Sequence, residues 1–272
     1  MLIWDVYPDT FKITGMKPTH PIYKMWSRLN KMSFQKAYRI FTIGEKMKDL
    51  VAQYTERDKI ILTPIWSIFQ RNEKVEKENN PFIKKHQLEG AFIVQYSGNI
   101  GLTHNVEVMV DLAERLQGRS DILFQIIGRG PRKPVLEKLV EEKNLPNCIF
   151  LPFQSDEMFP YSLSAADIGV VILDDATSKG SVPSKSYNLM SYGIPSLYIA
   201  SEESELNSYA RKFGHAKCFE HNQLNKAVKF IKELAGNREL WEKYSENAEQ
   251  ASKNFRRGNA DKLVEKYLVI QD

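Results

Sequence analysis

The sequence predicts an α/β protein built on a doubly wound parallel sheet, and three observations support this fold class. From about Gly90 onward, short and almost uniformly apolar segments alternate with amphipathic segments of helical length. Strands that are apolar on both faces are typical of a parallel sheet covered by helices on both sides. With 272 residues, 42% of them hydrophobic, the chain can also bury a large core.

The predicted elements of this region follow one another in regular order. Strands are expected at 91–97, 122–128, 148–153, 168–173, 195–200 and 216–219. Helices are expected at 103–116, 132–144, 156–166 (interrupted near Pro160), 184–193 and 202–214, followed by two or three terminal helices. Sheets of this kind bind ligands beyond the carboxyl ends of their strands, in the turns that lead to helices. Those turns are therefore where a site is expected.

The chain before Gly90 is interpreted as two further parts. Residues 1–70 are expected to form a partial N-terminal domain, with Trp26, Tyr38 and Phe41 in its core rather than on a base-stacking surface. Its elements are a helical section within 21–41, a helix at 44–54 that buries Met47, Leu50, Val51 and Tyr54, and a strand at 59–66. Residues 71–89 are charge-dense with little to bury, which predicts a linker before a Rossmann-like domain at 90–272.

Composition excludes several classes of protein. The two cysteines and five histidines form no cluster with metal-ligand spacing, so neither a metal site nor a disulfide framework is expected. No apolar run is long enough to cross a bilayer, and the N-terminus lacks the pattern of an export signal. We therefore expect a cytoplasmic protein, and no nucleic-acid partner.

The positive charge is concentrated near the start of the chain. Between Lys12 and Lys48 there are nine lysines or arginines and one acid, Glu45. A solvated helix face is the favoured interpretation of this segment. Peripheral contact with an anionic membrane, at its inner face, or with a phosphate-rich ligand is the alternative.

Three predicted strand-to-helix turns stand out. The first contains Gly98 and Gly101, and the second contains Gly128 and Gly130. Glycine lets a ligand approach the backbone closely. The third turn is the start of the stretch SVPSKSYNLMSYGIP at 181–195.

These turns do not match the two commonest nucleotide-binding motifs. After Gly128 and Gly130, the third glycine of the dinucleotide fingerprint would fall at Lys133. In the third turn, the glycines of a phosphate loop would fall at Lys179 and Ser184. Hydride transfer and ATP hydrolysis are therefore both disfavoured.

Lys185 makes the third turn a candidate anion site. A helix beginning near Pro183 presents unpaired N–H groups and a positive dipole end, and Pro183 suits its first position. Ser184 adds a hydroxyl group, while a lysine works against the dipole unless an anion lies between them. The alternative is that Lys185 extends into water or pairs with Asp174 or Asp175.

The ordered series of motifs resembles the donor-binding half of family-4 glycosyltransferases of the GT-B fold, and is most similar to bacterial members that build surface polysaccharides. The motifs are YSGNIG, IIGRGP, LPF, SAADIGVVIL and VPSKSYNLMSYGIPSL, within residues 92–219. Similarity extends to the end of that family's N-terminal domain through WDVYPD, AYRIFTIGEKMKDLV and KIILTPIW. The chain is then expected to be a fragment, a shortened product or one subunit of a split enzyme.

The resemblance implies a glycosyltransferase of the hexosyltransferase type, retaining anomeric configuration, with no metal or cofactor. The substrates it implies are a nucleotide-diphosphate sugar, with UDP as the first expectation, and a saccharide or lipid-linked acceptor. The alternative is a donor-binding subunit that does no chemistry alone. A nucleotide-sugar epimerase of the same fold is a lesser alternative, because no acid and base pair is evident.

The resemblance also implies roles for individual residues. Lys185 and Arg129 would stabilise the leaving diphosphate and are the expected catalytic residues. The binding residues it implies are Gly98, Asn99 and Ser184 beside the diphosphate, Phe153 near the base or the diphosphate, and Asn188 near the ribose. Gly128 and Pro183 are further expected donor-binding residues. Two glutamates common in the family are replaced by Gly180 and Asn188, and a common arginine and lysine fall near Asn99 and His104.

Overall fold

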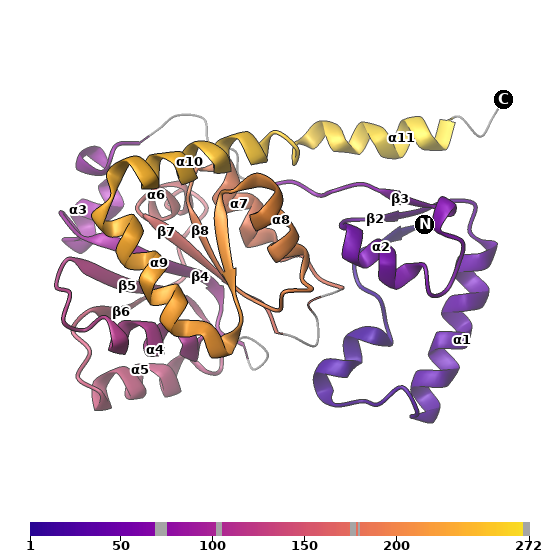
Figure 1. Cartoon of the computed structure of the whole chain (residues 1–272), viewed down its shortest axis with the longest axis horizontal. Coiled ribbons are helices and arrows are strands. Elements are labelled where there is room, and N and C mark those ends of the chain that lie inside the picture. Colours follow the sequence, from indigo (N-terminus) through magenta and orange to yellow (C-terminus); the bar gives the residue numbers. More distant parts are fainter. Residues whose placement is uncertain (69–74, 102–104, 175–177, 179, 269–272) are drawn as a thin grey trace.

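The computed structural model describes two parallel sheets flanked by helices (Figure 1). It describes residues 1–68, 75–101, 105–174, 178 and 180–268. A three-stranded sheet lies in the N-terminal part and a six-stranded sheet in the larger C-terminal part. No helix in these residues combines the length and apolar character needed to cross a membrane.

The six-stranded sheet has the doubly wound order that the alternating pattern predicts. Its strands are β4 (Phe92–Asn99), β5 (Ile122–Arg129), β6 (Cys148–Leu151), β7 (Ile168–Ile172), β8 (Ser196–Ile199) and β9 (Ala216–Phe219). They pair in parallel in the order β6-β5-β4-β7-β8-β9. The chain winds outward from β4 to β6 and then restarts beside β4 at β7, so the direction of winding reverses between β4 and β7. Ligands bind at such a reversal in open α/β sheets.

Helices cover both faces of this sheet. They are α4 (Glu107–Arg115), α5 (Lys133–Glu142), α6 (Phe159–Ser164), α7 (Ser184–Ser191), α8 (Glu205–Phe213), α9 (Leu224–Gly236) and α10 (Arg238–Ser252). One core cluster joins the sheet to α4, α5 and α9, and a second joins it to α6, α7 and α8. Pro160 lies in the first turn of α6 and does not interrupt it, because the first N–H groups of a helix need no intrahelical acceptor.

The N-terminal part is a small parallel unit whose core is shared with the larger part. Its elements are β1 (Leu2–Ile3), α1 (Pro21–Lys36), β2 (Ile40–Thr42), α2 (Glu45–Val51) and β3 (Ile60–Leu62). The predicted apolar face of α2 is confirmed, since Met47, Leu50, Val51 and Tyr54 are all buried. Met47 and Ile40 belong to the same apolar cluster as Tyr187 of α7 and Phe255 after α10.

The predicted linker is wrong in its described portion. Residues 81–86 form the short helix α3 (Pro81–His86), which begins at an Asn80 cap whose side chain accepts a hydrogen bond from Phe82 N at 2.9 Å. Phe82 and Ile83 are 0% and 2% exposed and join a core cluster with β4 and β5. A few apolar residues suffice here because the short helix packs both of them into the core.

The prediction that three aromatic residues lie in the N-terminal core is wrong for two of them. Phe41 is buried, but Trp26 and Tyr38 are 36% and 59% exposed. Helix α1 buries only the side that carries Tyr23 and Phe34. An aromatic residue on another side of this helix therefore remains at the surface.

The end of the chain returns to the N-terminal part. Helix α10 crosses the larger part, and α11 (Asp261–Leu268) then extends toward the end of the molecule that holds the three-stranded sheet (Figure 1). The side-chain amide of Asn259 donates a hydrogen bond to the carbonyl oxygen of Pro64 at 3.1 Å. The two parts are thus joined by this return as well as by the shared core.

Candidate functional site

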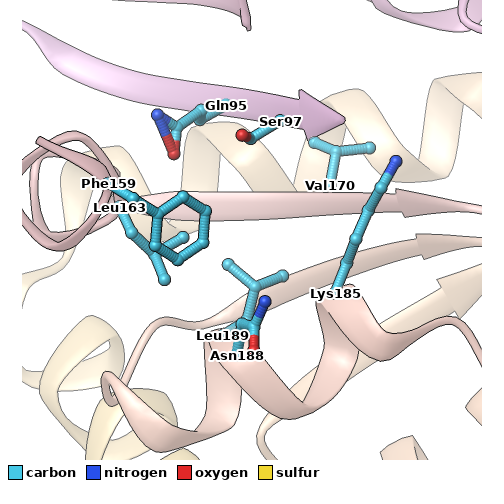
Figure 2. A pocket seen from close by; sticks show the side chains of 8 residues that line it. All are labelled: Gln95, Ser97, Phe159, Leu163, Val170, Lys185, Asn188 and Leu189. Carbon is cyan, nitrogen blue, oxygen red and sulfur yellow. The ribbon is translucent and has the colours of Figure 1, made fainter. Parts of the chain in front are cut away.

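The candidate site lies at the carboxyl ends of β4 and β7, where the winding of the sheet reverses. Helix α7 begins there, and the Lys185 side chain extends from its first turn toward the end of β4 (Figure 2). Gln95 and Ser97 of β4 and Asn188 of α7 line the same small cavity as Lys185. The structure therefore brings the third predicted turn to the first.

Glycines at the strand ends permit this close approach. A Cβ atom on Gly98 would lie 2.3 Å from Cε and 2.5 Å from Nζ of Lys185. The Gly98 φ of +149° is also one that other residues rarely adopt. Gly128 is the register partner of Gly98, and a Cβ atom there would lie 2.0 Å from the Gly98 carbonyl oxygen. The groups that approach these glycines in the structure are the lysine side chain and the neighbouring strand.

Lys185 is a largely buried cation without an anionic partner. Its Nζ lies 3.9 Å from the centroid of the Tyr96 ring, a cation–π contact. No carboxylate in the described residues pairs with it, Asp174 included, and Asp175 lies outside those residues. Burial lowers the pKa of Lys185 to about 7. A negatively charged ligand would relieve this cost by restoring a counter-ion.

The start of α7 adds hydrogen-bond donors to this charge. Pro183 is the residue that precedes the helix, one position earlier than the sequence indicated, and Ser184 is the first helical residue. Ser184 is exposed, and the first N–H groups of any helix lack intrahelical acceptors. Ser186 is the exception in this turn, since its N–H donates to the Pro183 carbonyl oxygen at 3.0 Å. A helix start with a free serine hydroxyl and a lysine is chemically suited to phosphate.

Asn188 faces both the cavity and the N-terminal part. Its Oδ1 accepts a hydrogen bond of 2.6 Å from the Ser67 hydroxyl, across 121 residues of chain. The cavity beneath it measures about 40 Å³, room for about one water molecule. Asn188 and Lys185 thus lie one helical turn apart. The family resemblance implies the first at the ribose and the second at the diphosphate.

The sequence interpretation missed the polar floor of this cavity. Gln95 Nε2 donates to Gln125 Oε1 at 3.0 Å and to the Ser162 carbonyl oxygen at 2.8 Å. Gln95 and Gln125 are register partners on β4 and β5. A glutamine in the middle of each of two apolar strand segments was the signal available in the sequence.

Arg129 and Phe153 form a second group on the same edge of the sheet. The Arg129 guanidinium lies 5.4 Å from the centroid of the Phe153 ring. Both side chains are exposed, with Phe153 at 57%. Asn99 is the register partner of Arg129, and its carbonyl oxygen accepts a hydrogen bond of 2.7 Å from the Tyr96 hydroxyl. An exposed aromatic ring beside a guanidinium at this edge could stack on a planar ligand.

The two positions where glutamate is common in the resembled family both face the N-terminal part. A Cβ atom on Gly180 would lie 3.2 Å from Cδ2 of Leu50 on α2. Asn188 contacts Ser67, as described above. His104, the other departure noted in the sequence, lies outside the described residues.

Other groups with reactive chemistry do not compete for this site. The thiols of Cys148 and Cys218 are both free, and burial raises the pKa of each to about 12. They therefore remain protonated at neutral pH and act as small apolar side chains. Within the described ranges, no three acids, histidines or cysteines gather closely enough to hold a metal ion.

Comparison with known proteins identifies the family to which this chain belongs. Residues 77–251 match the profile of the family described as "Glycosyl transferases group 1". The chain belongs to this family, which confirms the resemblance inferred from its motifs. The matched region begins before α3, in agreement with the packing of that helix on the larger sheet.

The chain is similar to two bacterial relatives over part of their length. It is 28% identical over 199 residues to the putative colanic acid biosynthesis glycosyl transferase WcaI of Escherichia coli, covering 71% of this chain and 48% of the relative. It is 24% identical over 212 residues to the probable glycosyltransferase WbjE of Pseudomonas aeruginosa, covering 76% and 52%. The chain thus spans about half the length of these relatives.

A solved structure confirms the fold. The crystal structure of Anabaena HepE in complex with UDP superimposes with a TM-score of 0.79 at 12% identity, covering 98% of this chain and 71% of that chain. At this identity the comparison bears on fold alone. The fold is that of GT-B glycosyltransferases, with the Rossmann-like sheet that the sequence predicts.

Proposed function

We propose that this chain binds a nucleotide-diphosphate sugar at the carboxyl ends of β4, β5 and β7 and takes part in transferring the sugar to a saccharide or lipid-linked acceptor. UDP is the first candidate for the nucleotide, because the structurally similar HepE was solved with UDP. Transfer with retention of anomeric configuration, by a hexosyltransferase, is the finer form of the proposal. Family membership supports the class of reaction.

The observation that carries the proposal is the largely buried ammonium group of Lys185, which pairs with no carboxylate in the described residues. A cation held against Tyr96 at the end of β4 has the place and the charge to stabilise the diphosphate that leaves during transfer. The N–H groups at the start of α7 and the Ser184 hydroxyl would share that negative charge. Asn188 would hydrogen-bond the ribose, and Arg129 with Phe153 would contact the base or the diphosphate.

A titration with nucleoside diphosphates tests this assignment. UDP, GDP and ADP are added separately to the wild-type chain, and the rise in melting temperature and the heat of binding are measured. Replacing Lys185→Ala should weaken binding of the preferred nucleotide about tenfold to a hundredfold, because a charge-assisted contact is lost. Lys138→Ala, which changes an exposed lysine on α5, is the matched control.

The outcomes separate the proposal from its alternatives. Absence of any thermal or calorimetric response to all three nucleotides would overturn it, and equal affinity of wild type and Lys185→Ala would remove Lys185 from the site. Nucleotide-sugar binding without turnover, restored by adding an acceptor-binding partner, would instead identify a donor-binding subunit.

A further inference from the structure

Tyr96 of β4 lies directly beneath the Lys185 ammonium group. Its side chain is 0% exposed and belongs to the core cluster that joins the sheet to α4, α5 and α9. Helix α7 packs on the other face of the sheet, with α6 and α8. The Lys185 Nζ nevertheless lies 3.9 Å from the centroid of the Tyr96 ring. The lysine side chain therefore passes the end of β4 and reaches an aromatic residue on the opposite face.

Gly98 leaves room for this contact. Side chains two residues apart on a strand point to the same face of the sheet, so the position of Gly98 neighbours that of Tyr96. A Cβ atom on Gly98 would lie 2.3 Å from Cε and 2.5 Å from Nζ of Lys185. A side chain at position 98 would thus keep the ammonium group away from the ring. The place where the charge is held therefore depends on both residues of β4.

The hydroxyl group of Tyr96 acts on the backbone at the same strand end. It donates a hydrogen bond of 2.7 Å to the carbonyl oxygen of Asn99, three residues along the chain. The N–H of the next residue, Ile100, donates to the Arg129 carbonyl oxygen at 2.9 Å. The backbone is therefore held from two sides where it leaves β4. Tyrosine can contact a cation and a carbonyl oxygen at once because its rigid side chain combines an aromatic ring with a polar hydroxyl.

The Tyr96 ring stabilises the ammonium group without neutralising it. The face of an aromatic ring carries partial negative charge, and its attraction for a cation grows when water is excluded. Burial works in the opposite direction, because it lowers the pKa of Lys185 to about 7. A carboxylate in the place of the ring would form an ion pair and compete with an anionic ligand. An aromatic ring leaves the whole positive charge for that ligand.

We propose that Tyr96 is a positioning residue of the nucleotide-sugar site, which holds the Lys185 ammonium group against its ring and the Asn99 backbone through its hydroxyl. This inference rests on the proposed function, because it concerns the diphosphate-binding part of the same site. Tyr96 is fully buried and acts through these two neighbours rather than by touching the ligand. If Tyr96 served the core alone, its replacement would change stability but neither the affinity for UDP nor the pKa of Lys185.

Two replacements of Tyr96 isolate the contribution of the ring. Tyr96→Phe and Tyr96→Leu both remove the hydroxyl, and only the second removes the ring. Loss of the cation–π contact should lower the pKa of Lys185 by about one unit in Tyr96→Leu relative to Tyr96→Phe. NMR titration of protein labelled in its lysine side chains measures this shift. The Lys185 signal is assigned by its absence from Lys185→Met.

The affinity for UDP should follow this pKa. At about pH 8.5 the free amine must take up a proton to bind the anion, so Tyr96→Leu should bind UDP about tenfold more weakly than Tyr96→Phe. At about pH 6 Lys185 is largely protonated before UDP binds, and the difference should shrink to about twofold. Calorimetry at the two pH values measures both affinities. A loss of packing alone would weaken binding equally at both.

Removing the ammonium group tests whether the ring acts through it. In a Lys185→Met background, Tyr96→Phe and Tyr96→Leu should bind UDP equally, because the two side chains no longer interact. Tyr198→Leu is the matched control, since Tyr198 is an equally buried tyrosine of β8 whose hydroxyl lies 2.8 Å from His215 Nε2. This replacement should lower the free energy of unfolding and leave the affinity for UDP and the pKa of Lys185 unchanged.

The contribution of the hydroxyl is measured by comparing Tyr96→Phe with wild type. Tyr96→Phe should bind UDP about threefold more weakly, because the Asn99 carbonyl oxygen loses its donor. Urea unfolding verifies that each variant is folded, and Tyr96→Met supplies a second variant without a ring.

The outcomes distinguish this inference from the proposed function. If wild type binds no nucleoside diphosphate, the proposed function fails and the role of Tyr96 fails with it. If wild type binds UDP through Lys185 while all three Tyr96 variants bind it as tightly as wild type does, only the role of Tyr96 is overturned. An unchanged pKa of Lys185 in both ringless variants would overturn that role as well.

Discussion

Each end of the six-stranded sheet holds a charge largely withdrawn from water, but among the described residues only the charge at the amino end has a partner of opposite sign. At the amino end, just before β7, Asp167 accepts a hydrogen bond of 2.6 Å from Ile93 N and forms an ion pair with Lys77. At the carboxyl end, Lys185 has an aromatic ring beside it and no carboxylate in the described residues. A buried charge with partners holds the fold together, whereas one without partners costs stability and is suited to a ligand.

The hydrogen bonds around the two charges differ in the same way as their ion pairing. At the amino end the backbone carbonyl of Asp167 also accepts a hydrogen bond of 2.8 Å from the Trp241 indole, and Lys77 donates to the Ala91 carbonyl oxygen at 3.1 Å. Helix α10, the short 3-10 helix Lys77–Asn79 that precedes α3, and the sheet therefore meet around a satisfied ion pair. At the carboxyl end, Gly98 and Gly128 leave the backbone of the strand ends without side chains. The first N–H groups of α7 have no intrahelical acceptor. The first arrangement is structural, and the second is the one that we propose for binding.

The largest expected effect comes from breaking the ion pair at the amino end. Asp167→Ala should lower the free energy of unfolding by about 3 kcal/mol, because it leaves a buried N–H unsatisfied and Lys77 unpaired. Asp167→Asn should cost less, since its amide oxygen can still accept from Ile93 N. Urea unfolding measures both. The comparison fails if either variant, while folded, alters the affinity for nucleoside diphosphate.

An added methyl group at the carboxyl end should weaken nucleotide binding as well as lower stability. Gly98→Ala places a Cβ atom where the Lys185 side chain now lies and forces an unfavourable φ, at a cost of about 1–3 kcal/mol. The displaced lysine should weaken UDP binding about tenfold. Gly118→Ala is the matched control, because a Cβ atom there meets nothing within 4 Å. Calorimetry measures the affinity of both variants for UDP. Equal affinity of Gly98→Ala and Gly118→Ala would count against the site.

Removing the unpaired charge should stabilise the unliganded protein. The folded-state pKa of Lys185 is about 7, below the ordinary 10.5, so protonation favours the unfolded chain at every pH below about 10. This penalty grows as pH falls and is complete below about pH 7. Lys185→Met should therefore raise the free energy of unfolding at pH 7 by about 1–2 kcal/mol, less than the full shift allows because the ammonium can extend toward water.

The same measurement at about pH 10 should show a smaller gain, since Lys185 is then already neutral in the folded protein. Lys138→Met, at an exposed position, should change stability little at either pH. A Lys185→Met variant less stable than wild type at pH 7 would mean that the ammonium has a stabilising partner after all.

Sequence patterns predicted the parts of this protein that depend on local order. Uniformly apolar strand segments predicted the parallel sheet, and Gly98, Gly128 and Lys185 were identified because each falls in or beside a predicted strand-to-helix turn. In the structure the two glycines are the penultimate residues of β4 and β5, and Lys185 lies in the first turn of α7. The pairing of Gln95 with Gln125, and of Ser67 with Asn188, depends on strand register and on how the two parts meet, which no local pattern encodes.

The two wrong predictions of burial have a similar cause, because a local pattern does not show what packs against it. Helical periodicity identified the apolar side chains of α1, but it does not say which faces of a helix other elements cover. Trp26 was therefore expected in the core, although it lies at the surface. In the opposite direction, the charges of residues 71–89 concealed the two apolar side chains, Phe82 and Ile83, that anchor α3.

Proton uptake on UDP binding tests the central claim most directly. An anion bound beside Lys185 should raise the pKa of its ammonium group from about 7, so at about pH 8.5 each UDP bound should bring about one proton with it. Calorimetry in buffers of different ionisation enthalpy measures that proton. We predict uptake by wild type and none by Lys185→Met; UDP binding to wild type without proton uptake would contradict a diphosphate at Lys185.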